Sequence, residues 1–364
     1  MRISFFGSSL VSSYWNGACT YYRGIIRALN ELGHEVTFYE PIAYERQEHR
    51  DIDDPPWATV VIYPAEAPAD VLSTVERAAG SDVVVKTSGV GVFDELLEES
   101  VLTLGSASTT TIFWDVDAPA TLGRMEADPS DGLRSLIPVY DIVFTYGGGD
   151  PVVARYEALG ARRCVPVYNG LDPTTHHPVE PEPRFEADLS FLGNRLPDRE
   201  ARVDEFFFRA ASLQPTKTFL LGGSGWDTKS FSDNVDYIGH VSTIDHNAFN
   251  CSPGAVLNVS RDSMATNGFS PATRVFEACG AGACLITDYW EGIDHFLEPD
   301  SEVLVAHDGE EVAEIVSALD VAAARRVGEA ARRRVLRDHT YASRAAQVME
   351  ILEGRLAPSG RLHG

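Results

Sequence analysis

The sequence is short of positive charge, and lysine is nearly missing from it. Its 30 lysine and arginine residues stand against 54 aspartate and glutamate residues, so the formal net charge is −24. The only lysines are Lys86, Lys217 and Lys229. Because proteins bind nucleic acids and anionic membrane surfaces through lysine and arginine, this balance argues against both kinds of partner. A small anionic ligand is compatible with it, since a few arginines can hold one.

Cysteine is also scarce, and no long apolar run occurs. The five cysteines are an odd number without zinc-type spacing, which argues for a reducing compartment and against a disulfide scaffold or a metal site. No stretch approaches the roughly 20 apolar residues that span a bilayer. The first residues, MRISFFGSSL, lack the apolar run of a signal peptide. We therefore expect a cytoplasmic protein without membrane insertion.

At 364 residues the chain is too long for one typical domain. In its first half, short β-rich runs alternate with helical patterns such as 151–159, which is typical of a parallel sheet covered on both faces. The expected strands are 2–6, 35–39, 59–63, 83–86, 110–114, 142–146 and 164–168.

A second series follows the loop NGLDPTTHHPVEPEP, in which we expect His176 and His177 to be solvated. Its expected strands are 189–192, 218–221, 237–238, 255–259, 284–287 and 303–305, and its expected helices are 198–212, 271–280, 310–319, 321–338 and 341–356. The sequence thus predicts two doubly wound, Rossmann-like α/β domains, residues 1–170 and 171–364, with the C-terminal helices packing back on the first.

Polar residues that follow predicted strands are the candidate binding residues, because open α/β sheets bind ligands at the carboxyl ends of their strands. The segment SFLGNRLPDR ends one strand and presents Gly193, Asn194, Arg195 and Arg199. A glycine allows close backbone approach, and two arginines near a helix N-terminus would complement a diphosphate. A plain turn with solvated arginines explains the same residues about equally well.

The segment LLGGSGW places Gly222, Gly223 and Gly225 after another predicted strand. It has neither the GxGxxG nor the GxxxxGK[ST] spacing, so it supports neither a redox dinucleotide site nor a P-loop. The glycines indicate either a tight turn or a close approach to phosphate.

The densest polar segment begins where the strand 255–259 ends. It contains Arg261, Asn267 and Gly268, and a helix is then expected to open with Ser270 as N-cap and a proline at its first position. In that helix Arg274 and Glu277 are three residues apart and share a face. A surface salt bridge is the simpler interpretation, but the other residues of the helix are small and apolar, which implies burial. Buried charges need partners or a ligand.

Taken together, these segments resemble a known family. GFSPATRVFEACGAGACLITD, with DLSFLGNRLPDR upstream and FWDVDAP in the first half, is similar to the CgeB-like, spore-maturation-type glycosyltransferases, which belong to the group-1 nucleotide-sugar glycosyltransferases. The resemblance extends from DVVVKTSG to HTYASRAA. It implies a GT-B fold, in which two Rossmann-like domains face each other across a cleft and the second binds the donor nucleotide.

The resemblance also implies roles for individual residues. Glu277 would accept hydrogen bonds from the donor ribose, and Arg195 and Arg199 would pair with the diphosphate. Arg274 would support that region or the sugar. The base would be recognised by backbone contacts in the segment YIGHVS, at His240 and Val241.

One departure from the family pattern concerns the sugar. Retaining members often carry a second glutamate eight residues before the ribose-binding one, and here that position is Phe269. The neighbouring Asn267, Gly268 and Ser270 would then contact the sugar. Gly223 and Arg261 are further candidate donor-binding residues. Whether the anomeric configuration is retained or inverted is left open.

The first domain is expected to face the acceptor. Ser8, Ser9 and Asn16 follow the first strand and are candidate polar contacts. In WDVDAP, Asp115 and Asp117 end another strand, where helix capping and general-base catalysis are about equally good explanations. We favour Asp117 as the base. The pair is not a convincing DxD metal site, because cations and helix dipoles generally stabilise the leaving diphosphate in this fold.

These observations predict a hexosyltransferase-type, metal-independent glycosyltransferase that needs no cofactor besides its nucleotide-sugar co-substrate. Two alternatives stay open: a non-hydrolysing sugar-nucleotide epimerase and a catalytically silent nucleotide-sugar-binding protein. The acceptor, which could be a glycan, a small molecule or a protein, cannot be read from the sequence. The donor sugar, its base, the oligomeric state and any link to sporulation cannot be read either.

Overall fold

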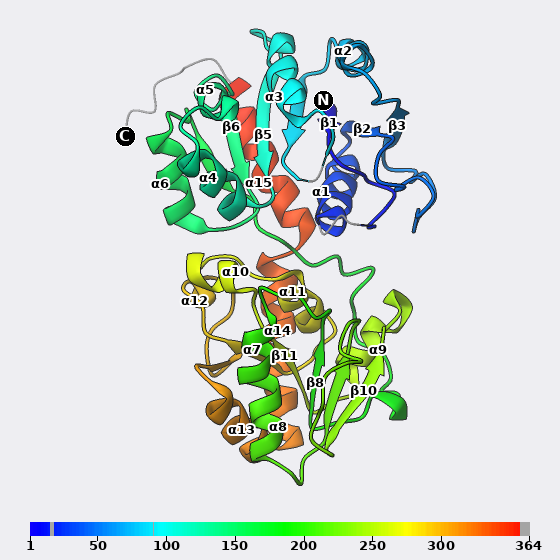
Figure 1. Ribbon diagram of the computed structural model, residues 1–364, viewed down its shortest axis with the longest axis vertical. Helices are drawn as coiled ribbons and strands as arrows, with labels where there is room; N and C mark the ends of the chain where they lie inside the picture. Colours follow the sequence, from blue (N-terminus) through cyan, green and yellow to red (C-terminus); the bar gives the residue numbers. More distant parts are fainter. Residues whose placement is uncertain (15–17, 90, 357–364) are drawn as a thin grey trace. The chain divides into compact units, whose positions relative to one another are not determined.

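The computed structural model describes residues 1–14, 18–89 and 91–356, and the chain divides into two compact units (Figure 1). The first comprises Met1–Tyr168 together with Tyr341–Gly364, and the second comprises Asn169–Thr340. The first division falls two residues before the expected one at Gly170. Each unit is a parallel sheet with helices on both faces.

The sheet of the first unit has seven strands in the order β3-β2-β1-β4-β5-β6-β7, and every pair is parallel. The first strand lies inside the sheet, and later strands are added first on one side and then on the other, as in a doubly wound fold. The strands are β1 Arg2–Phe6, β2 Glu35–Pro41, β3 Thr59–Tyr63, β4 Val83–Thr87, β5 Thr110–Asp115, β6 Ile142–Thr145 and β7 Cys164–Pro166.

Two apolar layers cover this sheet. On one face α1 and α15 pack together against β1 and β5, and Gly24 permits this because a Cβ there would overlap the ring of Tyr341. The remaining helices pack on the other face. The helical segments of the unit are α1 Cys19–Glu31, α2 Pro68–Arg77, α3 Asp94–Ser100, η1 Val101–Leu104, α4 Ala118–Ala127, α5 Gly132–Leu136, α6 Gly149–Ala158 and α15 Tyr341–Leu356.

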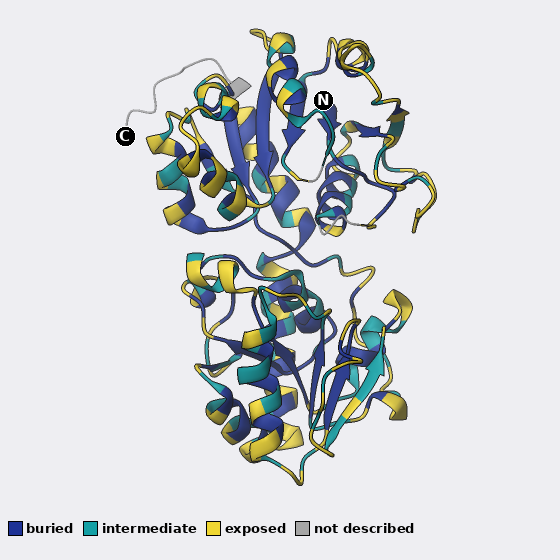
Figure 2. Ribbon diagram, in the orientation of Figure 1, coloured by how far each residue is buried: buried dark blue, intermediate teal, exposed yellow. Residues whose placement is uncertain are grey.

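The second unit repeats the plan with six parallel strands in the order β10-β9-β8-β11-β12-β13. The residues of the four inner strands are buried, whereas most residues of the edge strands β10 and β13 are partly exposed (Figure 2). The direction of strand addition reverses between β8 and β11. The strands are β8 Leu189–Leu192, β9 Phe219–Gly222, β10 Val235–Gly239, β11 Ala255–Asn258, β12 Leu285–Asp288 and β13 Leu304–Ala306.

The helices of the second unit differ from the expected ones in several places. The expected helix 198–212 contains a π-helical turn, the expected helix 271–280 begins at Thr273, and the polar segment after β11 includes a short helix. The segments are η2 Pro183–Phe185, α7 Glu200–Val203, η3 Asp204–Phe208, α8 Arg209–Leu213, η4 Thr243–Asp245, α9 His246–Cys251, α10 Asp262–Asn267, α11 Thr273–Gly280, α12 Ile293–Phe296, α13 Gly309–Ala318 and α14 Val321–Asp338.

The two C-terminal helices belong to different units. Helix α15 packs on α1 in the first unit, whereas α14 packs on α11 in the second, so only one of them returns to the first domain. Within the described residues no helix combines the length and the apolar character needed to cross a membrane.

Glu98 on α3 is a buried acid whose ionisation should limit the stability of the first unit. Burial raises its pKa to about 6, although Lys86 and Arg124 oppose the shift. The ionised carboxylate therefore costs folding free energy above pH 6, and this cost disappears as the pH falls below the ordinary pKa of a glutamate. Glu98→Gln should raise the free energy of unfolding at pH 7.5 by up to about 2 kcal/mol and change little at pH 4.

Urea denaturation at the two pH values measures this difference. Glu99→Gln, at an exposed position on the same helix, is the control and should leave both values unchanged. An equal effect of Glu98→Gln at pH 4 and pH 7.5 would contradict the role assigned to ionisation.

Candidate functional site

The candidate donor site lies in the second unit, where the direction of strand addition reverses. The loop 193–199 follows β8, and the loop 259–261 with α10 follows the neighbouring strand β11. Crevices at this point of a doubly wound sheet are where such folds bind ligands. All the predicted donor-side arginines lie on these two loops and on α11.

The glycine-rich turn after β9 fits against the loop after β8. The amide of Gly193 donates to the carbonyl of Gly222 at 2.9 Å, and the amide of Arg195 donates to the carbonyl of Ser224 at 2.9 Å. Gly223 has a φ of +117°, and a Cβ there would overlap the carbonyl oxygen of Gly193. Glycine at this position thus allows the loops after β8 and β9 to approach closely, as the tight-turn interpretation expects.

Arg195 is already engaged in an ion pair. Its guanidinium donates to Glu200 at 2.6 Å and to Thr228 at 3.0 Å, and the bond to Glu200 raises the pKa of Arg195. Lys229 contacts the same Glu200 carboxylate at 3.3 Å. A diphosphate would have to compete with Glu200 for this arginine, so its predicted contact with the diphosphate stays a prediction.

Arg199 is the last residue of the loop after β8, and its side chain folds back onto that loop. Its Nη2 donates to the carbonyl of Asn194 at 2.5 Å, and its guanidinium stacks over the ring of Phe191 at 5.7 Å. Its buried Nε has no hydrogen-bond partner among the described residues. Burial lowers the pKa of Arg199; the charge of Asp198 opposes this shift and the like charge of Arg261 adds to it. No carboxylate within ion-pair distance neutralises this cation in the described part of the chain.

Arg274, in the first turn of α11, is the second cation without a close counter-ion. Burial lowers its pKa to about 10; Glu277 opposes this shift and the like charge of Arg199 adds to it. Across the residues that the structure describes, its guanidinium makes no hydrogen bond or ion pair. Two such cations near each other favour an anionic ligand.

The N-terminus of α11 is open. The helix begins at Thr273 after Ala272, which provides no side-chain cap. The expectation that Ser270 caps this helix is wrong, because Ala272 is still extended, with φ −65° and ψ 151°. The amides of Thr273 and Arg274, at the start of the helix, form the kind of helix end that binds phosphate.

The segment before α11 is held in an unusual conformation. Phe269 has a φ of +44°, its amide donates to the carbonyl of Glu291 at 2.6 Å, and its ring fills space that a Cβ at Gly292 would occupy. Gly268 also has a positive φ, and the side-chain amide of Asn267 donates to the carbonyl of Ser263. Strained backbone of this kind is often found at functional sites.

Three further predicted donor-side residues, Arg261, His240 and Val241, have environments that are common in folded proteins. Arg261 is exposed and pairs with Asp198 at 2.5 Å. His240 is exposed, whereas the side chain of Val241 is buried against Leu192 and Phe249. Only the backbone of Val241 is therefore suited to meet a nucleobase, as the backbone-contact interpretation requires.

Glu277 has a neighbour that sequence reasoning missed. Its Oε1 lies 3.8 Å from Nε2 of His176, and 20% of the glutamate side chain and 10% of the histidine side chain are exposed. The expectation that both linker histidines are solvated is wrong for His176 and right for His177. No sequence signal separates the two, because only the folding of the linker onto α9 and α11 buries the first.

In the first unit the two aspartates after β5 have different environments. Asp115 is fully buried and accepts hydrogen bonds from Ser88 at 2.7 Å, Thr121 at 2.9 Å, the amide of Asp117 at 3.0 Å and Tyr156 at 2.5 Å. Asp117 is exposed, and no amide of the described first turn of α4 donates to its carboxylate. Asp115 thus has a structural role, and the capping interpretation fails for the side chain of Asp117.

The predicted acceptor-side serines are buried. The hydroxyl of Ser9 accepts a hydrogen bond from the amide of Ser12, and the carbonyl of Ser8 accepts one from Arg46. Their side chains belong to the packing of the loop after β1. Asn16 lies outside the described residues.

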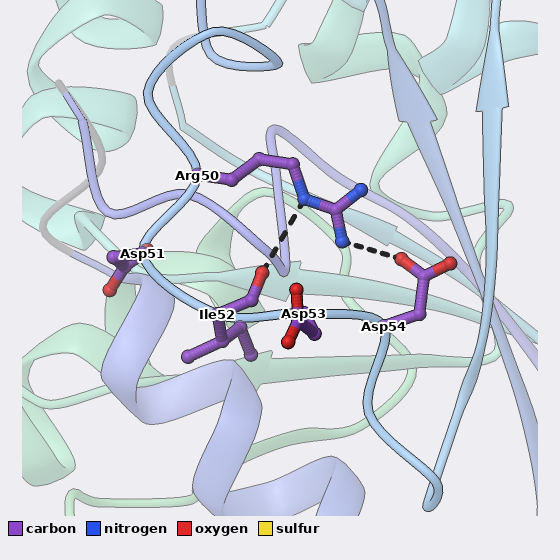
Figure 3. Close-up of a pocket in the computed structure, with 5 residues that line it drawn as sticks. All are labelled: Arg50, Asp51, Ile52, Asp53 and Asp54. Carbon is purple, nitrogen blue, oxygen red and sulfur yellow. Dashed lines mark hydrogen bonds and ion pairs between the residues drawn. The ribbon is translucent and has the colours of Figure 1, made fainter.

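The first unit also has a surface pocket, formed by the loop 50–54 (Figure 3). Arg50 bridges it by donating to the carbonyl of Ile52 and to Asp54, and Asp51 pairs with Arg23 at 2.7 Å. Two of the three acids of the pocket, Asp51 and Asp54, are thus paired with arginines of the protein. Among the described residues, no three histidine, cysteine or acidic side chains gather as a metal site would require.

The structure is similar to solved glycosyltransferases along nearly its whole length. Sucrose-phosphate synthase from Thermosynechococcus elongatus matches with a TM-score of 0.69 and 14% identity, covering 98% of this chain and 99% of that one. HepE of Anabaena, solved with UDP and glucose, matches with a TM-score of 0.64 and 14% identity over 97% and 100%. An α-glucosyltransferase solved with UDP-glucose and DNA matches with a TM-score of 0.70 and 14% identity, covering 97% of this chain and 99% of that one. The predicted GT-B fold is confirmed.

Residues 199–350 match a family described as glycosyl transferase-like. This range includes Arg199, Arg274 and Glu277 and ends within α15. A search among curated proteins finds no match to the chain.

Proposed function

We propose that this protein is a glycosyltransferase that moves a sugar from a nucleoside-diphosphate sugar to an acceptor hydroxyl. The GT-B fold and the glycosyl transferase-like match over residues 199–350 support this function. The observation that carries the nucleotide-sugar assignment is the presence of two half-buried, neighbouring arginines without close counter-ions among the described residues, Arg199 and Arg274, the second of which lies in the first turn of α11.

These groups suit a diphosphate in both the ground state and the transition state. The amides of Thr273 and Arg274 and the two guanidinium groups provide donors and positive charge at one place. Negative charge builds up on the diphosphate as the bond to the sugar breaks. Fixed donors and cations stabilise that charge without a metal ion, which is the basis of the proposed metal-independent mechanism.

Glu277 is the proposed ribose ligand. A carboxylate that accepts a hydrogen bond from a ribose hydroxyl contributes about 1.5–3 kcal/mol. Glu277→Gln should therefore weaken the binding of UDP by about 10- to 100-fold in calorimetric titration. Glu314→Gln, at an exposed position on α13, is the matched control and should bind as the wild type does. Unchanged affinity in Glu277→Gln would remove the ribose assignment.

Release of nucleoside diphosphate from UDP-, ADP- and GDP-sugars, with and without an acceptor panel, tests the function. A glycosyltransferase releases the diphosphate in step with a glycosylated acceptor. Conversion of the donor sugar without an acceptor would instead identify an epimerase. Tight binding without any turnover would identify a catalytically silent nucleotide-sugar-binding protein.

The finer assignments are also proposals. The motifs around Phe269 and Glu277 support a CgeB-like subtype, and the free state of all five cysteines fits a reducing, cytoplasmic location. The proposed acceptor is a hydroxyl compound. No cofactor is proposed beyond the donor itself.

A further inference from the structure

The linker that enters the second unit is fastened to two of its helices. The amide of His176 donates to the carbonyl of Asp172 at 3.0 Å. On the side of α9, the side chain of Asn247 donates to the carbonyl of Thr175 at 2.9 Å and accepts from the amide of His177 at 3.2 Å. The segment 172–177 therefore has a fixed position on α9.

The same segment lies unusually close to α11. A Cβ at Gly280 would lie 3.1 Å from the carbonyl oxygen of His176 and would overlap the side chain of Leu171. Glycine at this point allows the linker to contact the helix. Glu277 is three residues earlier on α11 and thus on the same side of the helix.

The imidazole of His176 is aimed at Glu277. Its Nδ1 donates a hydrogen bond to the hydroxyl of Thr175 at 3.0 Å, because that hydroxyl donates its own proton to the carbonyl of Asp172 at 3.1 Å. Nε2 lies 3.8 Å from Oε1 of Glu277, which is ion-pair distance when the imidazole is protonated. His246 stands beside it, with the two rings 6.4 Å apart. Burial lowers the pKa of His246, and the charge of Glu277 opposes this shift. The carboxylate of Glu277 thus lies beside the imidazole of His176, with His246 next to that ring and Arg274 on the same helix as Glu277.

We propose that His176 is a positioning residue: it holds the carboxylate of Glu277 in the orientation that the donor ribose requires. This inference rests on the proposed function. A free glutamate side chain loses rotamer freedom when it binds a ligand, and a neighbour that restricts it beforehand removes part of that entropy cost. Because His176 acts through Glu277, its effect should appear only with ligands that Glu277 contacts.

Calorimetric titration with UDP and with 2′,3′-dideoxy-UDP tests this dependence. His176→Phe keeps a ring of similar size but removes both nitrogens. We expect it to weaken UDP binding about fivefold and to leave dideoxy-UDP binding unchanged. In the double variant with Glu277→Gln, the affinity for UDP should equal that of Glu277→Gln alone, because the two residues act as one unit.

Three further variants keep the test independent of misfolding. His176→Asn can replace the bond to Thr175 but is too short to reach Glu277, so it should behave as His176→Phe does. His176→Gln carries an amide nitrogen near the position of Nε2 and should restore most of the affinity. His177→Phe changes the exposed neighbour and should bind both nucleotides as the wild type does.

Other outcomes overturn the inference. Equal losses for both nucleotides, or losses that multiply in the double variant, would mean that His176 acts only through the fold. If Glu277→Gln loses the preference for ribose while His176→Phe keeps it, His176 has no positioning role and the proposed function stands. If Glu277→Gln itself binds both nucleotides as the wild type does, the ribose assignment fails and this inference fails with it.

Discussion

Replacing Arg274 by methionine is expected to lower kcat/KM for the nucleotide-sugar donor by about 10²- to 10³-fold, while the protein becomes slightly more stable. The loss follows from removing a fixed cation at the point where the diphosphate gains charge. The gain in stability follows from the lowered pKa of Arg274, about 10, because a guanidinium whose pKa is lowered by burial costs folding free energy at neutral pH. Steady-state kinetics and thermal unfolding of the same preparation measure both effects.

The control for this experiment is Arg325→Met. Arg325 is an exposed residue of α14 that pairs with Glu329 at 2.7 Å, and such surface pairs contribute little. Its loss should change neither activity nor melting temperature appreciably. A destabilised Arg274→Met variant with normal donor affinity would show that Arg274 has a structural role.

Replacing Asp117 by asparagine is expected to lower kcat by about 10²- to 10⁴-fold, the usual contribution of a general base. The exposed carboxylate at the end of β5 is available for this role because it does not cap α4. Since the proposed donor contacts all belong to the second unit, the variant should bind UDP with unchanged affinity. Kinetics and calorimetry together separate the two effects.

Two neighbouring substitutions define the specificity of the Asp117 result. Glu126→Gln on α4 removes an exposed acid that pairs with Arg155 and should retain full activity. Asp115→Asn disturbs a buried carboxylate with four hydrogen-bond donors, so it should chiefly lower the melting temperature. Near-normal kcat in Asp117→Asn would exclude the general-base role.

The fold could be predicted in some detail because its strands are short, apolar and separated by helical patterns. Each expected strand lies on an observed one, and Arg2–Phe6, Thr59–Tyr63 and Leu189–Leu192 have the expected bounds. Buried parallel strands leave this signal because both of their faces are covered. Helix starts were harder: the serine-proline pair before α11 is typical of a helix beginning, yet Ala272 stays extended.

Helix α10 was missed for a physical reason as well. It has six residues, and none of them is buried, so it lacks the apolar stripe by which a helix is recognised in a sequence. Its place is fixed instead by contacts between loops, such as the hydrogen bond from the amide of Asp262 to the carbonyl of Asp198.

The site was predictable in its residue types but not in its pairings. The order of motifs indicated Arg199, Arg274 and Glu277, and the structure gives each arginine an environment suited to an anion. That Glu200 would engage Arg195, and that His176 would be buried beside Glu277, depends on how loops fold onto each other. Sequence spacing carries no information on such contacts.

The most direct test of a nucleotide-sugar donor site is thermal unfolding in the presence of UDP, ADP, GDP and their glucose conjugates. A ligand at 100 times its dissociation constant adds about 2.7 kcal/mol to the free energy of unfolding. We predict that at least one of these nucleotides raises the melting temperature of the wild type and that Arg274→Met loses most of the shift. No shift with any of them, for a protein that unfolds cooperatively, would contradict the proposed function.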